Sequence, residues 1–169
     1  SSLPWLGTFH SVCAKILRRH AESVGLNSHF TIIDQDDQVR LIKNICKGEN
    51  IDIKKLAPQY ILALINNWKN KGWLPKDVIV KKGIPLEREI LIVYKYYQEK
   101  IKALNSCDFG DLILLCVNMF ENNREILELY ENNFKYILVD EYQDTNFIQS
   151  KWLNLLSEKN KNICCVGDD

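Results

Sequence analysis

The spacing of apolar residues changes after Asn133, and this change constrains the fold more than any other feature. Before it, apolar side chains recur near the helical period of 3.6 residues, which predicts amphipathic helices. These helices cover residues 9–24, 34–48, 56–68, 85–104, 109–120 and 124–130. After it, residues 136–139 and 162–166 are short apolar runs that flank a helical pattern at 147–157, an order typical of a parallel βαβ unit. The sequence therefore predicts a mainly α chain with a small α/β part.

Single residues mark where several of these helices begin and end. Thr8, Asp34 and Asp108 each precede a helical pattern, and their side chains predict N-caps. Gly25 predicts the end of the first helix. Pro85 suits the first turn of the fourth helix because its fixed backbone angle is already helical.

The composition of the 169-residue chain excludes several classes of protein. Apolar residues make up 46% and charged residues 26%, which is typical of a globular rather than a disordered chain. No apolar run reaches the roughly 18 residues that a membrane span needs, so no membrane partner is expected. The six cysteines include no C-x-x-C pair, which argues against a zinc site and favours a cytoplasmic location.

The 22 basic and 22 acidic side chains balance overall but are distributed unevenly. Residues 1–83 hold 13 Lys or Arg and 7 Asp or Glu, whereas residues 84–169 hold 9 and 15. This asymmetry favours a polyanion-facing first half, although ordinary solvated helix faces also account for such charge runs.

Two adjacent carboxylates, Asp140 and Glu141, directly follow the apolar run at 136–139. Open α/β sheets bind ligands beyond the carboxyl ends of their strands, so both are candidates for phosphoryl chemistry. One carboxylate can hold Mg²⁺, and the other can orient or deprotonate an attacking water. The pattern alone is equally compatible with a solvated loop that caps the next helix. A further alternative is a Mg²⁺-dependent nuclease or phosphatase that uses Asp140, Glu141 and Asp144 without ATP.

The longer sequence DEYQDTN at 140–146, followed by VGDD at 166–169, resembles motifs II and III of superfamily 1 DNA helicases of the UvrD/Rep/PcrA family. The sequence GTFHS at 7–11 is similar to motif Ib of that family, and DFGDL at 108–112 to its Asp-Phe-x-Asp-Leu motif. These motifs occur in the order that the family has. The resemblance implies that the apolar strands belong to an incomplete parallel sheet of the P-loop (RecA-like) type.

The resemblance also implies a role for each matching acidic or amide residue. Asp140 would bind the Mg²⁺ of Mg-ATP through water, and Glu141 would activate the water that attacks the γ-phosphate. Gln143 would contact the nucleotide and, together with Asp144, would link the nucleotide state to the DNA-binding surface.

DNA contacts are expected in two places. By the resemblance, Thr8 and His10 would contact single-stranded DNA at phosphate. A basic, turn-rich stretch adds lysines that either attract phosphates or are ordinary solvated charges. These lysines are Lys69, Lys71, Lys81 and Lys82. The neighbouring Trp68 is in phase with apolar residues of its helix and is predicted to be core.

The resemblance divides the chain into three parts. Residues 1–24 would carry the motif Ib helix of the first motor domain, and residues 25–125 would form a helical insertion subdomain. Residues 126–169 would be a partial α/β motor domain that carries motif II and the start of motif III.

No Gly-Lys dipeptide occurs in the sequence, so it contains no G-x-x-x-x-G-K-[ST] P-loop. We therefore expect an excised piece that does not hydrolyse ATP alone, from an ATP-dependent 3′–5′ DNA helicase of DNA repair or replication. Its expected partners are single-stranded DNA, junctions of single and double strands, and repair or replication proteins. The alternative is a non-enzymatic module for DNA binding or partner docking.

Overall fold

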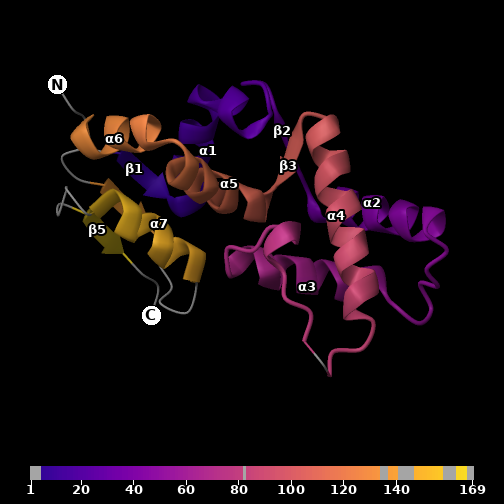
Figure 1. Cartoon of the computed structure of the whole chain (residues 1–169). Helices are drawn as coiled ribbons and strands as arrows, with labels where there is room; N and C mark the ends of the chain where they lie inside the picture. The colour runs from indigo at the N-terminus through magenta and orange to yellow at the C-terminus, as the bar shows by residue number, and fades with distance from the viewer. Residues whose placement is uncertain (1–4, 82, 134–136, 141–146, 158–162, 167–169) are drawn as a thin grey trace. The chain divides into compact units, whose positions relative to one another are not determined.

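The computed structural model describes the backbone of residues 5–81, 83–133, 137–140, 147–157 and 163–166. The chain divides into two compact units (Figure 1). Unit 1 comprises Ser1–Ser28 with Asp111–Asp169, and unit 2 comprises His29–Gly110. Unit 2 is therefore inserted into the sequence of unit 1.

Unit 1 combines a small parallel sheet with helices. Its strands are β1 (Trp5–Thr8), β4 (Ile137–Asp140) and β5 (Ile163–Val166), in the order β1-β4-β5. Its helices are α1 (Phe9–Arg19), the 3₁₀ helix η1 (Ala21–Val24), α5 (Phe109–Asn122, whose first two residues belong to unit 2), α6 (Arg124–Asn133) and α7 (Phe147–Ser157). The predicted parallel βαβ unit is confirmed, because β4 and β5 pair in parallel and α7 connects them. Strand β1 was not predicted.

Helix α5 is built into unit 1 by contacts with the helices around it. Phe120 packs on Tyr130 of α6 with ring centroids 5.9 Å apart, and Glu121 pairs with Lys151 of α7 at 2.6 Å. The boundary between the two compact units falls between Gly110 and Asp111. The division into a motif Ib helix, an insertion subdomain that ends at residue 125 and a partial motor domain stays a prediction. The pattern of α5 predicts an apolar face but does not say which neighbours cover it.

Unit 2 is mainly helical. Its elements are β2 (Thr31–Ile33), α2 (Gln35–Gly48), α3 (Pro58–Asn70), the 3₁₀ helix η2 (Pro75–Asp77), α4 (Glu87–Ala103) and β3 (Ser106–Asp108). Helices α2, α3 and α4 pack on one another around an apolar core (Figure 1). Trp68, predicted to be core, is 2% exposed and stacks on Tyr94 at a centroid distance of 5.6 Å.

A second parallel sheet, which the sequence did not predict, joins the two ends of unit 2. Thr31 of β2 pairs with Ser106 of β3, and their hydroxyl oxygens are 2.7 Å apart. Asp108, predicted as a helix cap and as the first residue of the DFGDL motif, is the last residue of β3 and directly precedes α5. Two three-residue strands are too short to give a readable alternation of polar and apolar residues.

The helix boundaries follow the local signals in one case and differ in two. Asp34 caps α2, because its carboxylate accepts a hydrogen bond from the Asp37 N–H at 2.8 Å. Gly25 was predicted to end the first helix, but α1 ends at Arg19, and Gly25 instead ends the separate 3₁₀ helix η1 in a left-handed conformation with φ of 78°. Helix α4 begins at Glu87 rather than at Pro85, because Leu86 has a φ of 60° that interrupts the helix.

Candidate nucleotide and nucleic-acid site

The carboxyl ends of the three parallel strands of unit 1 lie side by side. In the strand register Thr8, the last residue of β1, is opposite Asp140, the last residue of β4, and Asp140 is opposite Val166, the last residue of β5. The residues of motifs Ib and II and the beginning of motif III therefore meet at one edge of the sheet. Parallel α/β sheets bind ligands at this edge because their loops diverge there and leave room for them.

The predicted catalytic residues can be located only in part. The backbones of Thr8 and Asp140 are fixed by the sheet, but their side chains lie outside the described residues. Glu141, Gln143 and Asp144 lie entirely outside them. Their roles in metal binding, catalysis and coupling stay predictions.

His10 is in the first turn of α1, two residues beyond the strand end at Thr8. Its side chain is partly buried, and burial lowers the pKa of His10 to about 4. The imidazole is therefore neutral at pH 7. A neutral imidazole can donate one hydrogen bond to a phosphate or sugar oxygen but contributes no positive charge to phosphate binding.

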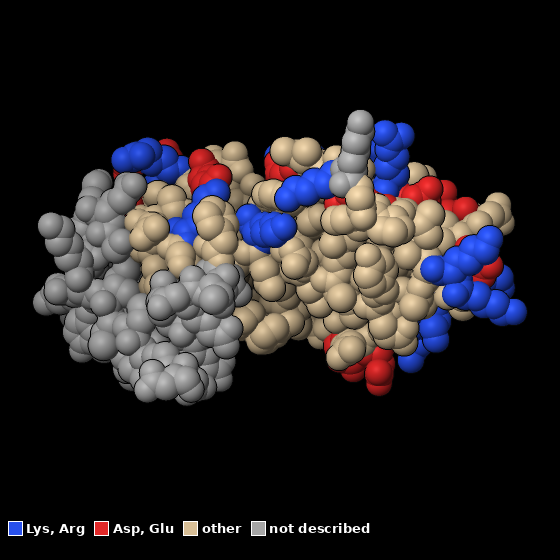
Figure 2. All heavy atoms as spheres, turned by 90° about the horizontal axis from the view of Figure 1, so that it is seen from below, with Lys and Arg blue, Asp and Glu red and all other residues tan. Residues whose placement is uncertain are grey.

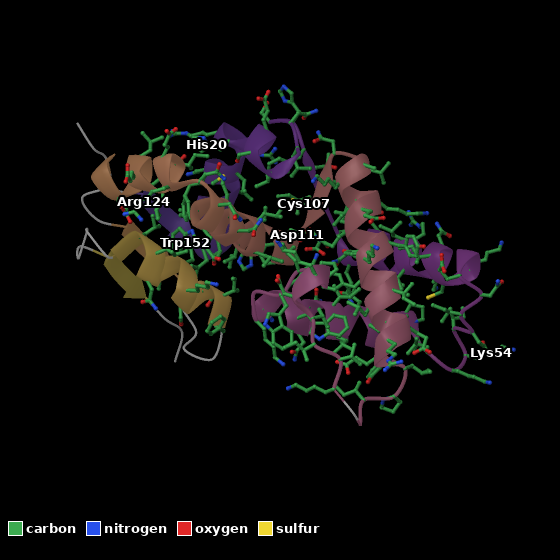
Figure 3. All side chains as sticks on the ribbon, in the orientation of Figure 1. His20, Lys54, Cys107, Asp111, Arg124 and Trp152 are labelled. Carbon is green, nitrogen blue, oxygen red and sulfur yellow. The ribbon has the colours of Figure 1, made fainter. Side chains whose placement is uncertain are left out.

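The start of α1 is held against the helix that follows motif II. Phe9 is 1% exposed and meets Trp152 of α7 edge-to-face, with ring centroids 5.6 Å apart and planes at 76°. Trp152 is fully buried and lies on α7 (Figure 3), where its ring contacts Phe9 of α1. This contact connects the motif Ib helix with the segment after motif II, and sequence reasoning missed it because it joins residues far apart in the chain.

Lys69 is not part of an exposed basic surface, so this prediction is wrong. The side chain is buried, and its ammonium nitrogen lies 2.5 Å from a carboxylate oxygen of the equally buried Asp108. The same Asp108 oxygen accepts hydrogen bonds from the hydroxyl of Tyr97 at 2.6 Å and from the amide of Gln38 at 3.3 Å. We call these four residues the Asp108 cluster. It joins α2, α3, α4 and β3 in the interior of unit 2.

The sequence did contain a signal for this burial. Lys69 follows Leu62 and Ile65 by seven and four residues, so all three lie on one face of α3. Leu62 and Ile65 are both buried, and Lys69 continues their stripe. A lysine on such a stripe needs an acidic partner, but the pattern of α3 does not show that Asp108 supplies it.

Two other lysines of the predicted DNA-facing patch are exposed. Lys71 is exposed and its ammonium lies 4.9 Å from the centroid of the Trp73 ring. Lys81 is exposed, and its backbone N–H donates to a carboxylate oxygen of Glu87 at 2.8 Å. Lys82 lies outside the described residues. The patch is thus reduced to Lys71 and Lys81 among the described residues.

Two further features bear on the kind of site. Within the described parts of the chain, no group of three or more His, Cys, Asp or Glu side chains is arranged to hold a metal ion. The side chain of Asp140, the predicted Mg²⁺ ligand, lies outside these described parts. None of the described helices has the length and apolar character needed to cross a bilayer.

Comparison with known proteins identifies the family. The model of the UvrD/REP helicase N-terminal domain matches residues 1–169. A probable DNA helicase II homolog of Rickettsia conorii is 48% identical over 167 residues, which are 97% of this chain and 26% of that protein. The ATP-dependent DNA helicase PcrA of Staphylococcus aureus is 44% identical over 164 residues, 97% of this chain and 22% of that protein. The chain spans about a quarter of the length of the curated relatives it matches. The chain belongs to the UvrD/REP helicase N-terminal domain family.

Proposed function

We propose that this chain is part of an ATP-dependent DNA helicase that moves 3′ to 5′ on single-stranded DNA and acts in repair or replication. One observation carries the proposal: Thr8, Asp140 and Val166 are adjacent at the carboxyl edge of one parallel sheet. Motif Ib, assigned to DNA, and motif II, assigned to the nucleotide, therefore start from neighbouring strands. Because β1 and β4 are neighbours, a movement at the nucleotide-binding end of β4 would be transmitted directly to the DNA-binding end of β1.

Mg-ATP fits the donor set expected at this edge, where a carboxylate follows a strand of a parallel sheet. Asp140 would hold Mg²⁺ through water, and Mg²⁺ would neutralise charge on the phosphates. Glu141 would accept a proton from the attacking water, and Gln143 and Asp144 would pass the change at the nucleotide to the DNA-binding surface. The P-loop lysine would have to come from outside these residues, since they contain no Gly-Lys dipeptide. We infer that the chain by itself does not hydrolyse ATP.

DNA would be held along the same edge and on unit 2. Thr8 and His10 would hydrogen-bond the backbone of single-stranded DNA, His10 as a neutral imidazole. Lys71 and Lys81, with Lys82, would add electrostatic attraction to phosphates near a junction of single and double strands. The partners of this helicase would be repair or replication proteins.

The test uses the full-length protein with Glu141→Gln and, as a matched control, Glu125→Gln on the exposed side of α6. Glu141→Gln is expected to keep ATP binding and to lower kcat of DNA-stimulated hydrolysis by about 10²–10⁴-fold, because the general base is lost. Glu125→Gln should leave kcat unchanged. Duplexes with 3′ or 5′ tails then report the direction of unwinding. Unchanged hydrolysis in Glu141→Gln would contradict the proposal, and Mg²⁺-dependent DNA cleavage without ATP would favour the nuclease alternative.

A further inference from the structure

A groove of about 790 Å³ lies between η2 and the outward face of α4, entirely within unit 2. Its apolar lining comes from Leu74 and Pro75 at the start of η2 and from Leu91 and Ile92 of α4. Ile92, in the middle of the 17-residue helix α4, is 46% exposed and is available for contact with a partner. A groove of this size accommodates several apolar side chains at once.

Hydrogen bonds within unit 2 hold the wall of the groove that η2 forms. The hydroxyl of Tyr94, a fully buried residue of α4, donates to the carbonyl oxygen of Trp73 at 2.6 Å. The Leu74 N–H donates to the Asp77 carboxylate at 3.0 Å, and the Asp77 N–H donates to the Leu74 carbonyl at 2.8 Å. The groove is therefore preformed, which lowers the entropy cost of binding.

The charged lining of the groove has mainly one sign. Lys76, Arg88 and Lys95 contribute three positive charges, and Glu99 contributes one negative charge. Arg88, Ile92, Lys95 and Glu99 follow one another at spacings of four, three and four residues, so they form one stripe along α4. At 1.5 Å per residue this stripe is about 16 Å long, which equals three turns of a second helix. Figure 2 shows a broad uncharged surface of unit 2 with both basic and acidic side chains along its border.

We propose that this groove binds an acidic amphipathic helix of a partner protein. The apolar residues of that helix, spaced i, i+4 and i+7, would cover Leu91, Ile92 and Leu74, and its acidic residues would face Arg88, Lys95 and Lys76. Single-stranded nucleic acid is a poorer match, because it binds to cationic tracks with aromatic platforms and the lining contains no aromatic side chain. The inference does not depend on the helicase activity, since it rests on unit 2 alone.

The probe is a fluorescein-labelled, 15-residue helical peptide with leucines at the three anchor positions and glutamates on both flanks. A second peptide has each glutamate replaced by lysine. Fluorescence anisotropy with the 169-residue chain is expected to give binding of the acidic peptide that weakens with salt. The lysine peptide should bind at least about tenfold more weakly, because its charges repel Arg88 and Lys95.

The variant Arg88→Glu with Lys95→Glu is expected to weaken binding of the acidic peptide at least about tenfold. Its matched control, Lys43→Glu with Lys54→Glu, makes the same change in net charge at exposed positions of unit 2 outside the groove and should change the affinity less than about twofold. Lys54 points outward from unit 2 (Figure 3). Ile92→Ser tests the apolar part and should also weaken binding. Far-UV circular dichroism and the melting temperature of each variant establish that it folds.

Several results would overturn the proposal. They are an equal loss of affinity in the control variant, equal binding of the two peptides, or no binding of the acidic peptide at millimolar concentration. A labelled single-stranded oligonucleotide that binds the chain and loses affinity in Arg88→Glu/Lys95→Glu, while the acidic peptide does not bind, would assign the groove to nucleic acid instead. Self-association of the chain that the same variant abolishes, again without peptide binding, would assign it to a second copy.

Discussion

Replacing Lys69 with methionine removes one charge of the buried pair in unit 2 and nearly preserves side-chain volume. The carboxylate of Asp108 then stays in the interior without the ammonium charge and keeps the hydrogen bonds from the hydroxyl of Tyr97 at 2.6 Å and the amide of Gln38 at 3.3 Å. Breaking a fully buried ion pair by removing one partner costs about 3–5 kcal/mol. Because two donors remain, we expect Lys69→Met to lower the free energy of unfolding by about 3 kcal/mol.

Urea denaturation followed by circular dichroism measures this loss, and the melting temperature should fall by about 6–12 °C for a chain of this size. Hydrogen exchange of the amides in α3, α4 and β3 locates the loss in unit 2. The control is Lys71→Met, which changes an exposed lysine beside the same helix and should stay within about 0.5 kcal/mol of the parent chain.

The double variant Lys69→Met/Asp108→Asn separates the charge from the packing. A neutral pair leaves no uncompensated charge, so the double variant should be more stable than Lys69→Met alone. A loss below about 1 kcal/mol for Lys69→Met would refute the reasoning. The same holds if the effects of the two substitutions simply add, because residues that form an ion pair are expected to be coupled.

Four further outcomes are expected. His10 should titrate near pH 4 by NMR. Because its pKa is lowered on folding, its contribution to the free energy of unfolding should be lost as the pH falls from 6.5 toward 4. A His10→Gln variant should lack this pH-dependent contribution. Asp34→Ala removes the N-cap of α2 and should cost about 1 kcal/mol in urea denaturation. Gly110→Ala should raise the free energy of unfolding by about 0.5–1 kcal/mol, because Gly110 lies in α5 and the nearest atom to an added Cβ is at 3.4 Å, an ordinary contact. Lys71→Gln with Lys81→Gln should reduce the salt slope of single-stranded DNA binding by about 1.4, and an unchanged slope would remove both lysines from the DNA-binding surface.

Local sequence signals predicted most helices correctly because each depends on residues that are close in the chain. The N-cap at Asp34 needs only an N–H three residues further on, and the left-handed Gly25 needs only the absence of a side chain. The start of α4 was misplaced by two residues. Pro85 is compatible with a helix, but the positive φ of Leu86 follows from how the chain approaches the helix and not from the residue type.

The candidate site was predicted as a set of motifs, not as an arrangement. Both strands are four residues long, but β4 begins with the apolar run Ile137–Val139, whereas β1 is interrupted by Gly7 and ends at the polar Thr8, so only β4 is readable as an apolar run. The pairing of β1 with β4, which aligns Thr8 with Asp140, joins residues more than 130 positions apart. Such a pairing depends on the rest of the sheet, so no window of sequence reveals it.

Periodicity, caps and motif spacing act over a few residues, so the helical content, the parallel βαβ unit and the motifs that identify the family can be read from the sequence. Three features depend instead on contacts between distant residues: the packing of α5 on α6 and α7, the alignment of Thr8 with Asp140, and the burial of Lys69. The physical reason is clearest for Lys69. A lysine is exposed or buried according to whether an opposite charge meets it in the interior, and Asp108 arrives there from a strand 39 residues further along the chain.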